Sequence, residues 1–130
     1  MTSLNDLSYA IIGAAMKVHR VLGPGLLESA YEACLEYELK KMGFAVERQK
    51  PVPVIYEEVH LDCGFRADLF VESRVLVECK AKEKLHPIDS AQVLSHLRLL
   101  HLQLGLLINF HELDLKDGIK RIVNRYREES

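Results

Sequence analysis

The chain has 130 residues, of which 48% are hydrophobic and 28% are charged, with 17 basic against 19 acidic side chains. These values predict a single domain, residues 1–130, and exclude long disorder and any attraction of nucleic acid by overall charge. No apolar run approaches the ~20 residues that span a bilayer, and three cysteines without a CxxC pair favour free thiols in the cytoplasm over a disulfide framework or a cysteine-rich zinc site.

Two amphipathic helices are expected first. Apolar residues recur at spacings of three and four over residues 7–22 and stop at Gly23-Pro24-Gly25, which predicts an N-terminal accessory helix within residues 1–22. A second helix follows and ends at Gly43. We expect its inner side to carry Leu27, Tyr31, Cys34, Leu35 and Met42, and its outer side to carry most of Glu32, Glu36, Lys40 and Lys41.

The middle of the chain changes to the pattern of β-strands. Strands are expected at residues 51–56, 65–71 and 75–81, the first at a sheet edge because it contains two prolines. A helix at residues 87–100 and a buried strand at residues 104–110 follow, whereas residues 118–127 fit either a helix or a strand. This order predicts a mixed α/β domain with a sheet flanked by helices.

Two carboxylates are expected to face each other across a hairpin. Side chains alternate faces along a strand, so Glu78 and Lys80 share one face. If the loop before this strand is centred on Ser73, Asp68 lies opposite Glu78, with Cβ atoms ~4.5–5.5 Å apart. Like charges at this distance repel each other, which predicts a cation between them.

A divalent metal suits these three residues. Mg²⁺ takes oxygen ligands, commonly one or two carboxylates with water, and Lys80 could hold a water or a phosphate oxygen. Such a metal would activate water and neutralise charge on a phosphodiester. The alternative that the residues leave open is a solvated hairpin in which Lys80 bridges the two acids. The histidines show no spacing typical of a zinc site.

The order of these residues resembles a known family. Asp68 followed by Glu78-Cys79-Lys80 is similar to the signature of the PD-(D/E)xK nuclease superfamily, and residues 25–31 (GLLESAY) resemble the motif of its GxxExxY family. The likeness continues through residues 65–68, 77–81, Gln92, 106–110 and 115–124, so it covers most of the chain from about Gly23 onward.

This resemblance implies a restriction-endonuclease-like αβββαβ core and a nuclease that depends on Mg²⁺ or Mn²⁺. It implies that Asp68 and Glu78 are metal ligands, with the backbone carbonyl of Cys79 as a third. Lys80 would orient the attacking water. Glu28 would supply an outer acidic group, and Gln92 would position Lys80 or the substrate.

The resemblance also implies a partner and leaves an alternative open. Nucleic acid is the expected partner, DNA before RNA, and basic residues such as Lys82 and Lys84 would bind its phosphates. The alternative is a module of the same fold that binds nucleic acid or a protein without turnover. The small size of the chain suggests a homodimer. His96 stands where members of the family often carry an aromatic residue, and Leu100-His101 replaces a Thr-Gly turn, which affects the contacts expected of Gln92.

Overall fold

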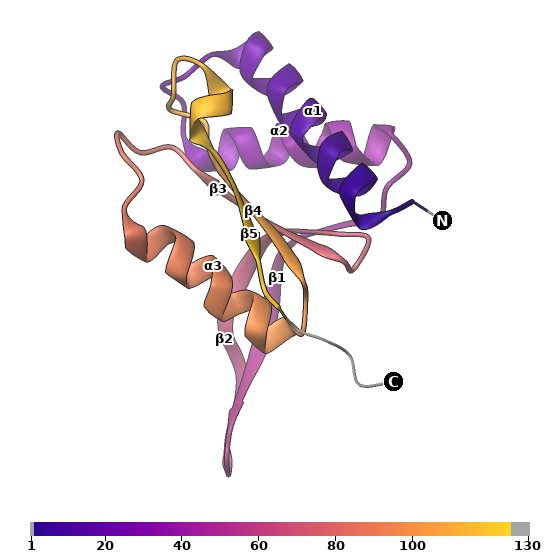
Figure 1. Cartoon of the computed structure of the whole chain (residues 1–130), viewed down its shortest axis with the longest axis vertical. Coiled ribbons are helices and arrows are strands. Elements are labelled where there is room, and N and C mark those ends of the chain that lie inside the picture. The colour runs from indigo at the N-terminus through magenta and orange to yellow at the C-terminus, as the bar shows by residue number, and fades with distance from the viewer. Residues whose placement is uncertain (1, 126–130) are drawn as a thin grey trace.

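The computed structural model describes residues 2–125 (Figure 1). The elements are α1 (Leu4–Leu22), α2 (Glu28–Lys41), β1 (Val46–Tyr56), β2 (Val59–Val71), β3 (Val75–Lys80), α3 (Pro87–Leu100), β4 (Leu104–Asn109), the 3₁₀ turn η1 (Leu115–Gly118) and β5 (Ile119–Val123). The stretch from α2 to β4 is the expected αβββαβ core, to which α1 and β5 are added. No helix within the described residues is long and apolar enough to span a membrane.

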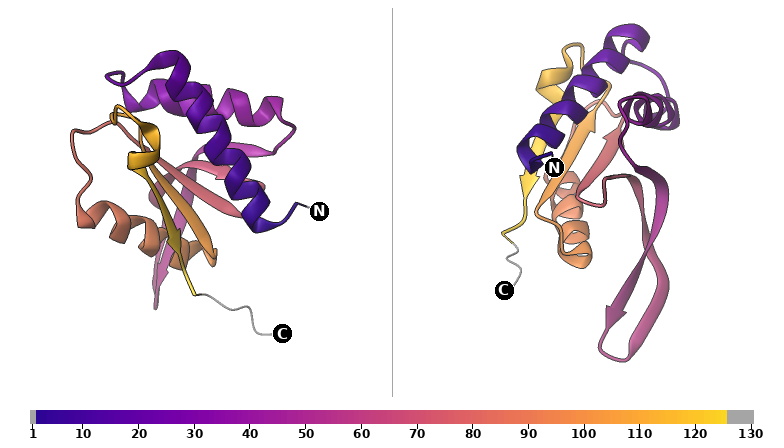
Figure 2. Two further views of the ribbon diagram at one scale, coloured as in Figure 1. Left: turned by 45° about the horizontal axis from the view of Figure 1, so that its top comes forward. Right: turned by 90° about the vertical axis from the view of Figure 1, so that its right-hand side faces the viewer.

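The sheet has the strand order β1-β2-β3-β4-β5, and only β3 and β4 run parallel. Helices α1 and α2 cover one face and α3 covers the other (Figures 1 and 2). All six residues of β4 are buried, as expected for a strand covered on both faces. The helix α3 comes close to β4 because residue 105 is a glycine: a methyl group there would lie 2.7 Å from Cγ1 of Val93.

The β1–β2 hairpin is longer than the sequence predicted. The two strands begin at Val46 and Val59, not at residues 51 and 65, and the far end of the hairpin projects beyond the helices (Figure 2). The pairing shifts register between Val52 and Val54, which breaks the regular alternation of the pattern. The first strand does lie at the sheet edge, as its prolines indicated.

Two expectations about the second helix need correction, and the alternative left open for the C-terminal segment is resolved. Leu27 and Met42 are exposed, because they flank α2 and are not part of it, whereas Glu32 is buried and not on the outer side. Of residues 118–127, the part 119–123 forms β5 paired with β4, which decides for a strand. Residues 126 and 127 lie outside the described part.

Tyr31 fixes the loop before α2. Its ring is fully buried and stacks on Phe110, with 4.6 Å between ring centroids, as expected of a core aromatic. Its hydroxyl donates to the carbonyl of Gly23 (2.6 Å) and accepts from the N–H of Leu26 (3.0 Å). The glycine and the tyrosine at the two ends of the sequence GLLESAY therefore have structural roles: φ of Gly25 is +99°, and Tyr31 anchors the loop.

Replacing Tyr31 with Phe should lower the free energy of unfolding by about 1–3 kcal/mol, because the Gly23 carbonyl and the Leu26 N–H both lose a partner. Urea denaturation measures this change. Tyr37→Phe is the matched control, since Tyr37 is exposed on α2 and its variant should unfold like the parent. Equal stability of all three proteins would contradict the anchoring role of the hydroxyl.

Candidate active site

The hairpin between β2 and β3 has the expected register. Leu69 pairs with Val77 and Val71 with Val75, so the turn is centred on Ser73, which has a left-handed φ of +52°. The pairing ends at Leu69 and Val77, one position before the two carboxylates. Asp68 and Glu78 thus leave the ladder together at the open end of the hairpin, where the strands no longer bond to each other.

Asp68 lies where the β1–β2 ribbon twists. Ala67 belongs to the apolar cluster beneath α3, whereas Leu69, two residues later, belongs to the cluster beneath α1 and α2. The pairing skips Gln49, which has a φ of +54°, so the change of face occurs at this point. Here Asp68 turns toward β3, and its Oδ2 accepts a hydrogen bond from the backbone N–H of Cys79 (2.9 Å).

Glu78 projects from β3 toward α3. It is buried, and Leu76, two residues earlier, packs in the cluster beneath α3, so both side chains share this face. Its Oε1 atom lies 3.6 Å from Nδ1 of His96 on α3. Among the buried side-chain atoms of the described residues, these two are the ones without a hydrogen-bond partner.

Burial shifts the pKa values of Asp68, Glu78 and His96. Burial, and then the charge of Glu78, raise the pKa of Asp68 to about 7, and burial raises the pKa of Glu78. Burial, followed by the charge of Lys80, lowers the pKa of His96. The carboxyl pair therefore holds protons to an unusually high pH, and a bound cation would have to displace them.

Cys79 and Lys80 lie on opposite faces of β3. The Cys79 side chain is fully buried in the cluster beneath α1 and α2. Burial, reinforced by the surrounding carboxylates, raises the pKa of its thiol, so the sulfur is a packing group and not a nucleophile. Lys80 is half-buried, and its charge acts on Asp68, Glu78 and His96.

A pocket of about 550 Å³ opens on the α2 side of Asp68. Glu28, the first residue of α2, borders it, and its Oε1 accepts from the N–H of Ala81 (3.2 Å), just after β3. The other residues that line the pocket are Leu26, Leu27, Ser29, Glu32, Gln49, Asp68 and Ala81. The acidic residue that the motif placed on α2 thus reaches the end of β3, next to Lys80.

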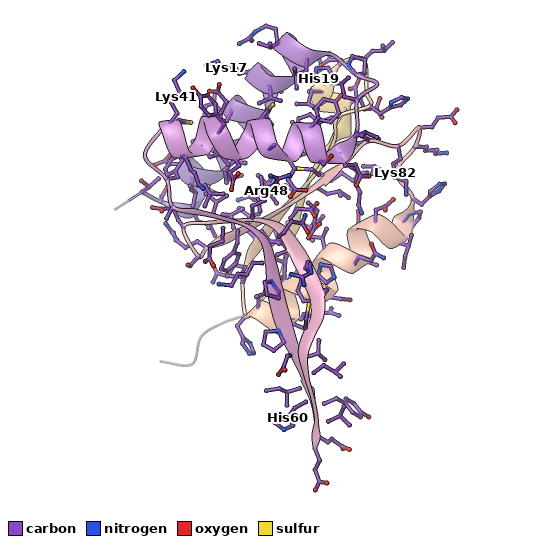
Figure 3. The ribbon with its side chains drawn as sticks, turned by 180° about the vertical axis from the view of Figure 1, so that it is seen from behind. Lys17, His19, Lys41, Arg48, His60 and Lys82 are labelled. Atoms are coloured by element: carbon purple, nitrogen blue, oxygen red, sulfur yellow. The ribbon has the colours of Figure 1, made fainter. Side chains whose placement is uncertain are left out.

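A relay of polar groups behind Asp68 was not expected from the sequence. Oε1 of the buried Glu32 accepts from Nε of Arg48 (2.9 Å) and from Nε2 of Gln49 (2.7 Å). Gln49 also donates to Oδ1 of Asp68 (3.2 Å). Figure 3 shows Arg48 beneath α2, at the end of the ribbon nearest the helices. The spacing of Glu32, one helical turn after Glu28, is a sequence feature that could have indicated its inward direction.

Gln92 is not brought into this arrangement. It is exposed on α3, one helical turn before His96, and none of the contacts found among the described residues joins it to Asp68, Glu78 or Lys80. Lys82, which was expected to bind phosphate, forms an ion pair within the protein. Its Nζ lies 3.1 Å from Oδ2 of the buried Asp89 at the start of α3.

The sequence of this chain was compared with models of known protein families. Residues 5–122 match the family model of the PD-(D/E)XK nuclease superfamily. The chain belongs to this superfamily. The match includes α1, whereas the likeness in the sequence was traced from about Gly23. Comparison with curated proteins and with solved structures gave no significant match.

The residues fit the divalent metal on which nucleases of the superfamily generally depend. Oε1 of Glu78 is a buried acceptor without a partner, and Asp68 uses two of its roughly four lone-pair positions in hydrogen bonds. Within residues 2–125 no three His, Cys, Asp or Glu side chains form a ready-made metal cluster. A hard cation does not need three such side chains, because two carboxylates and a backbone carbonyl, completed by water, supply suitable oxygen ligands.

Proposed function

We propose that this protein is a metal-dependent nuclease of the GxxExxY type that hydrolyses phosphodiester bonds of nucleic acid. The observation that carries the proposal is the pair of crowded carboxylates, Asp68 and Glu78, beside the amine of Lys80, with one buried Glu78 oxygen unpartnered. A protein that only needed a stable hairpin would gain by replacing Asp68, because burial and the charge of Glu78 oppose its ionisation.

In this proposal Asp68, Glu78 and the carbonyl of Cys79 hold Mg²⁺ or Mn²⁺, which would neutralise phosphate charge and lower the pKa of a bound water. Lys80 holds the water that attacks phosphorus. Glu28 assists from the pocket on the other side of Asp68, and the Glu32–Gln49 relay fixes the direction of the Asp68 carboxylate. Gln92, exposed on α3, is proposed to meet the substrate rather than Lys80.

A screen of labelled nucleic acids tests the activity. Single-stranded, duplex and branched DNA and RNA are incubated with the purified chain and Mn²⁺ or Mg²⁺, with DNA as the first substrate class. We expect cleavage that stops when a chelator is added. Intact substrates in every lane, although the chain binds the metal in calorimetry, would overturn the assignment as a nuclease.

A binding module without turnover is the second candidate. Both oxygens of Asp68 already accept hydrogen bonds, from Gln49 and from Cys79, which would stabilise this carboxylate without a metal. Titration calorimetry distinguishes the two. Binding of Mn²⁺ that disappears in Asp68→Asn supports the nuclease, and no binding at millimolar metal supports the module.

The affinity for metal should depend on pH in a range where ordinary carboxylates do not titrate. Because the pKa of Asp68 is raised to about 7, the metal displaces a proton below that pH. We expect the apparent affinity for Mn²⁺ to fall about tenfold for each pH unit below 7 and to level off above it. Calorimetry at pH 6, 7 and 8 measures this, and a constant affinity across the range would contradict the raised pKa.

We propose a cytoplasmic location for the protein. Cys34, Cys63 and Cys79 are free, which suits the reducing conditions of the cytoplasm. We also propose that residues 1–130 act as one unit, because α1 packs in the same apolar cluster as β3. A homodimer is proposed from the small size of the chain, and sedimentation analysis of the purified protein tests it.

A further inference from the structure

His96 directs a buried nitrogen at the carboxylate of Glu78. Its Nδ1 atom has no hydrogen-bond partner, and neither has the Glu78 Oε1 atom 3.6 Å away. This separation is too long for a hydrogen bond. Two buried polar atoms that face each other without bonding lose their hydration and gain nothing in return, so their arrangement needs an explanation.

The ring of His96 is held in this position from the other side. Phe65 of β2 stacks on it, with 3.7 Å between the ring centroids and 9° between the planes. Helix α3 is in turn held close to the sheet at Gly105. Only 22% of the His96 side chain is exposed. The imidazole is therefore a preorganised group, not a surface side chain that happens to lie near Glu78.

A metal ion between the two atoms would satisfy both. Adjacent ligands of an octahedral ion with bonds of ~2.1 Å stand roughly 3 Å apart, so Nδ1 and Oε1, now 3.6 Å apart, would have to approach each other by about 0.6 Å. Imidazole nitrogen is a good ligand for transition metals, whereas Mg²⁺ takes oxygen ligands and keeps its waters. A nitrogen donor beside carboxylates therefore favours a transition-metal ion such as Mn²⁺ over Mg²⁺.

We propose that Nδ1 of His96 is a further ligand of the divalent cation and that it makes this site prefer Mn²⁺ to Mg²⁺. The inference rests on the proposed metal site at Asp68 and Glu78 and adds a nitrogen donor from α3. The metal is then held by the ends of β2 and β3 and by α3, toward which Glu78 projects, so binding joins three elements of the core.

Calorimetry and electron spin-echo spectroscopy of the full chain test this without any measurement of cleavage. The variants are His96→Phe, which keeps a ring against Phe65, and His96→Gln, which keeps a polar group. His60→Phe and His60→Gln are the matched controls, because His60 lies at the far end of the β1–β2 hairpin (Figure 3). Thermal unfolding with chelator present shows whether each variant is folded.

In the parent and in the His60 variants we expect Mn²⁺ to bind at least about tenfold more tightly than Mg²⁺, with ¹⁴N coupling from one imidazole in the Mn²⁺ spectrum. Both His96 variants should lose the coupling and the preference, while their affinity for Mg²⁺ stays within about threefold of the parent. A parent spectrum without ¹⁴N coupling, or a preference that survives in folded His96 variants, would overturn the role of His96 alone. A parent chain that binds neither ion would overturn the proposed nuclease site as well.

Discussion

Replacing Asp68 with Asn should make the metal-free protein more stable and at the same time remove its metal site. The folded chain holds a proton on Asp68 up to about pH 7, whereas an unfolded chain releases it near the ordinary value of 3.8. The stabilising contribution of the protonated carboxyl is therefore complete below the unfolded value and is lost as the pH rises through 7. At pH 8 the folded state must carry a charge that burial and Glu78 oppose, and Asn avoids this charge.

The expected result is a higher melting temperature for Asp68→Asn at pH 8 with chelator present, and a much smaller difference at pH 4. About 1 kcal/mol moves the midpoint of a domain of this size by roughly 2–8 °C, so even part of the repulsion is measurable. Mn²⁺ should stabilise the parent by mass action and leave the variant unchanged. A variant that is less stable than the parent at pH 8 would show that the hydrogen bonds of Asp68 outweigh its repulsion.

Replacing Lys80 with Ala should abolish cleavage but not the binding of metal. The amine lies beside the carboxylates on the same face of β3 and is proposed to hold the attacking water, a role whose loss typically costs about 10²–10⁴-fold in rate. Removing a positive charge next to a cation does not weaken its binding at high pH. Cleavage rates together with calorimetry at pH 8 separate this variant from Asp68→Asn, which should lose both properties.

Lys41→Ala is the control for the removal of a positive charge. Lys41 ends α2 on the side of the molecule away from Lys82, as Figure 3 shows, and its loss should leave the cleavage rate unchanged. If Lys80→Ala cleaved as fast as Lys41→Ala, the water-holding role would have to be assigned to another group.

Local patterns predicted the elements whose ends are marked by distinctive residues. Helix α3 runs from Pro87 to Leu100 as expected, because proline suits the first helical position. The short turn between β2 and β3 fixed the register around Ser73, and with it the convergence of Asp68 and Glu78. In both cases the residues that determine the helix start or the strand register lie within a few positions of it in the sequence.

Other features depend on contacts between distant parts of the chain. Glu32 is buried because Arg48 and Gln49, on the first strand of the sheet, satisfy it. The spacing from Glu28 could indicate the inward direction of Glu32, but not these two partners. The approach of His96 to Glu78 depends on how closely α3 packs on the sheet at Gly105, a long-range property. The extra length of β1 was missed because the polar residues 47–50 hide the alternation. Residues 59–65 of β2 do alternate between apolar and polar side chains, and this pattern was overlooked.

The long β1–β2 hairpin carries part of the site on an arm that projects beyond the helices (Figure 2). Only three residue pairs, from Leu69–Val77 to Val71–Val75, join this arm to the rest of the sheet through β2 and β3. Asp68 and Phe65 both lie on the arm, whereas Glu78 belongs to the central strands. A movement of the arm relative to β3 would therefore change the distance between the two carboxylates, because they belong to different strands at the end of this pairing.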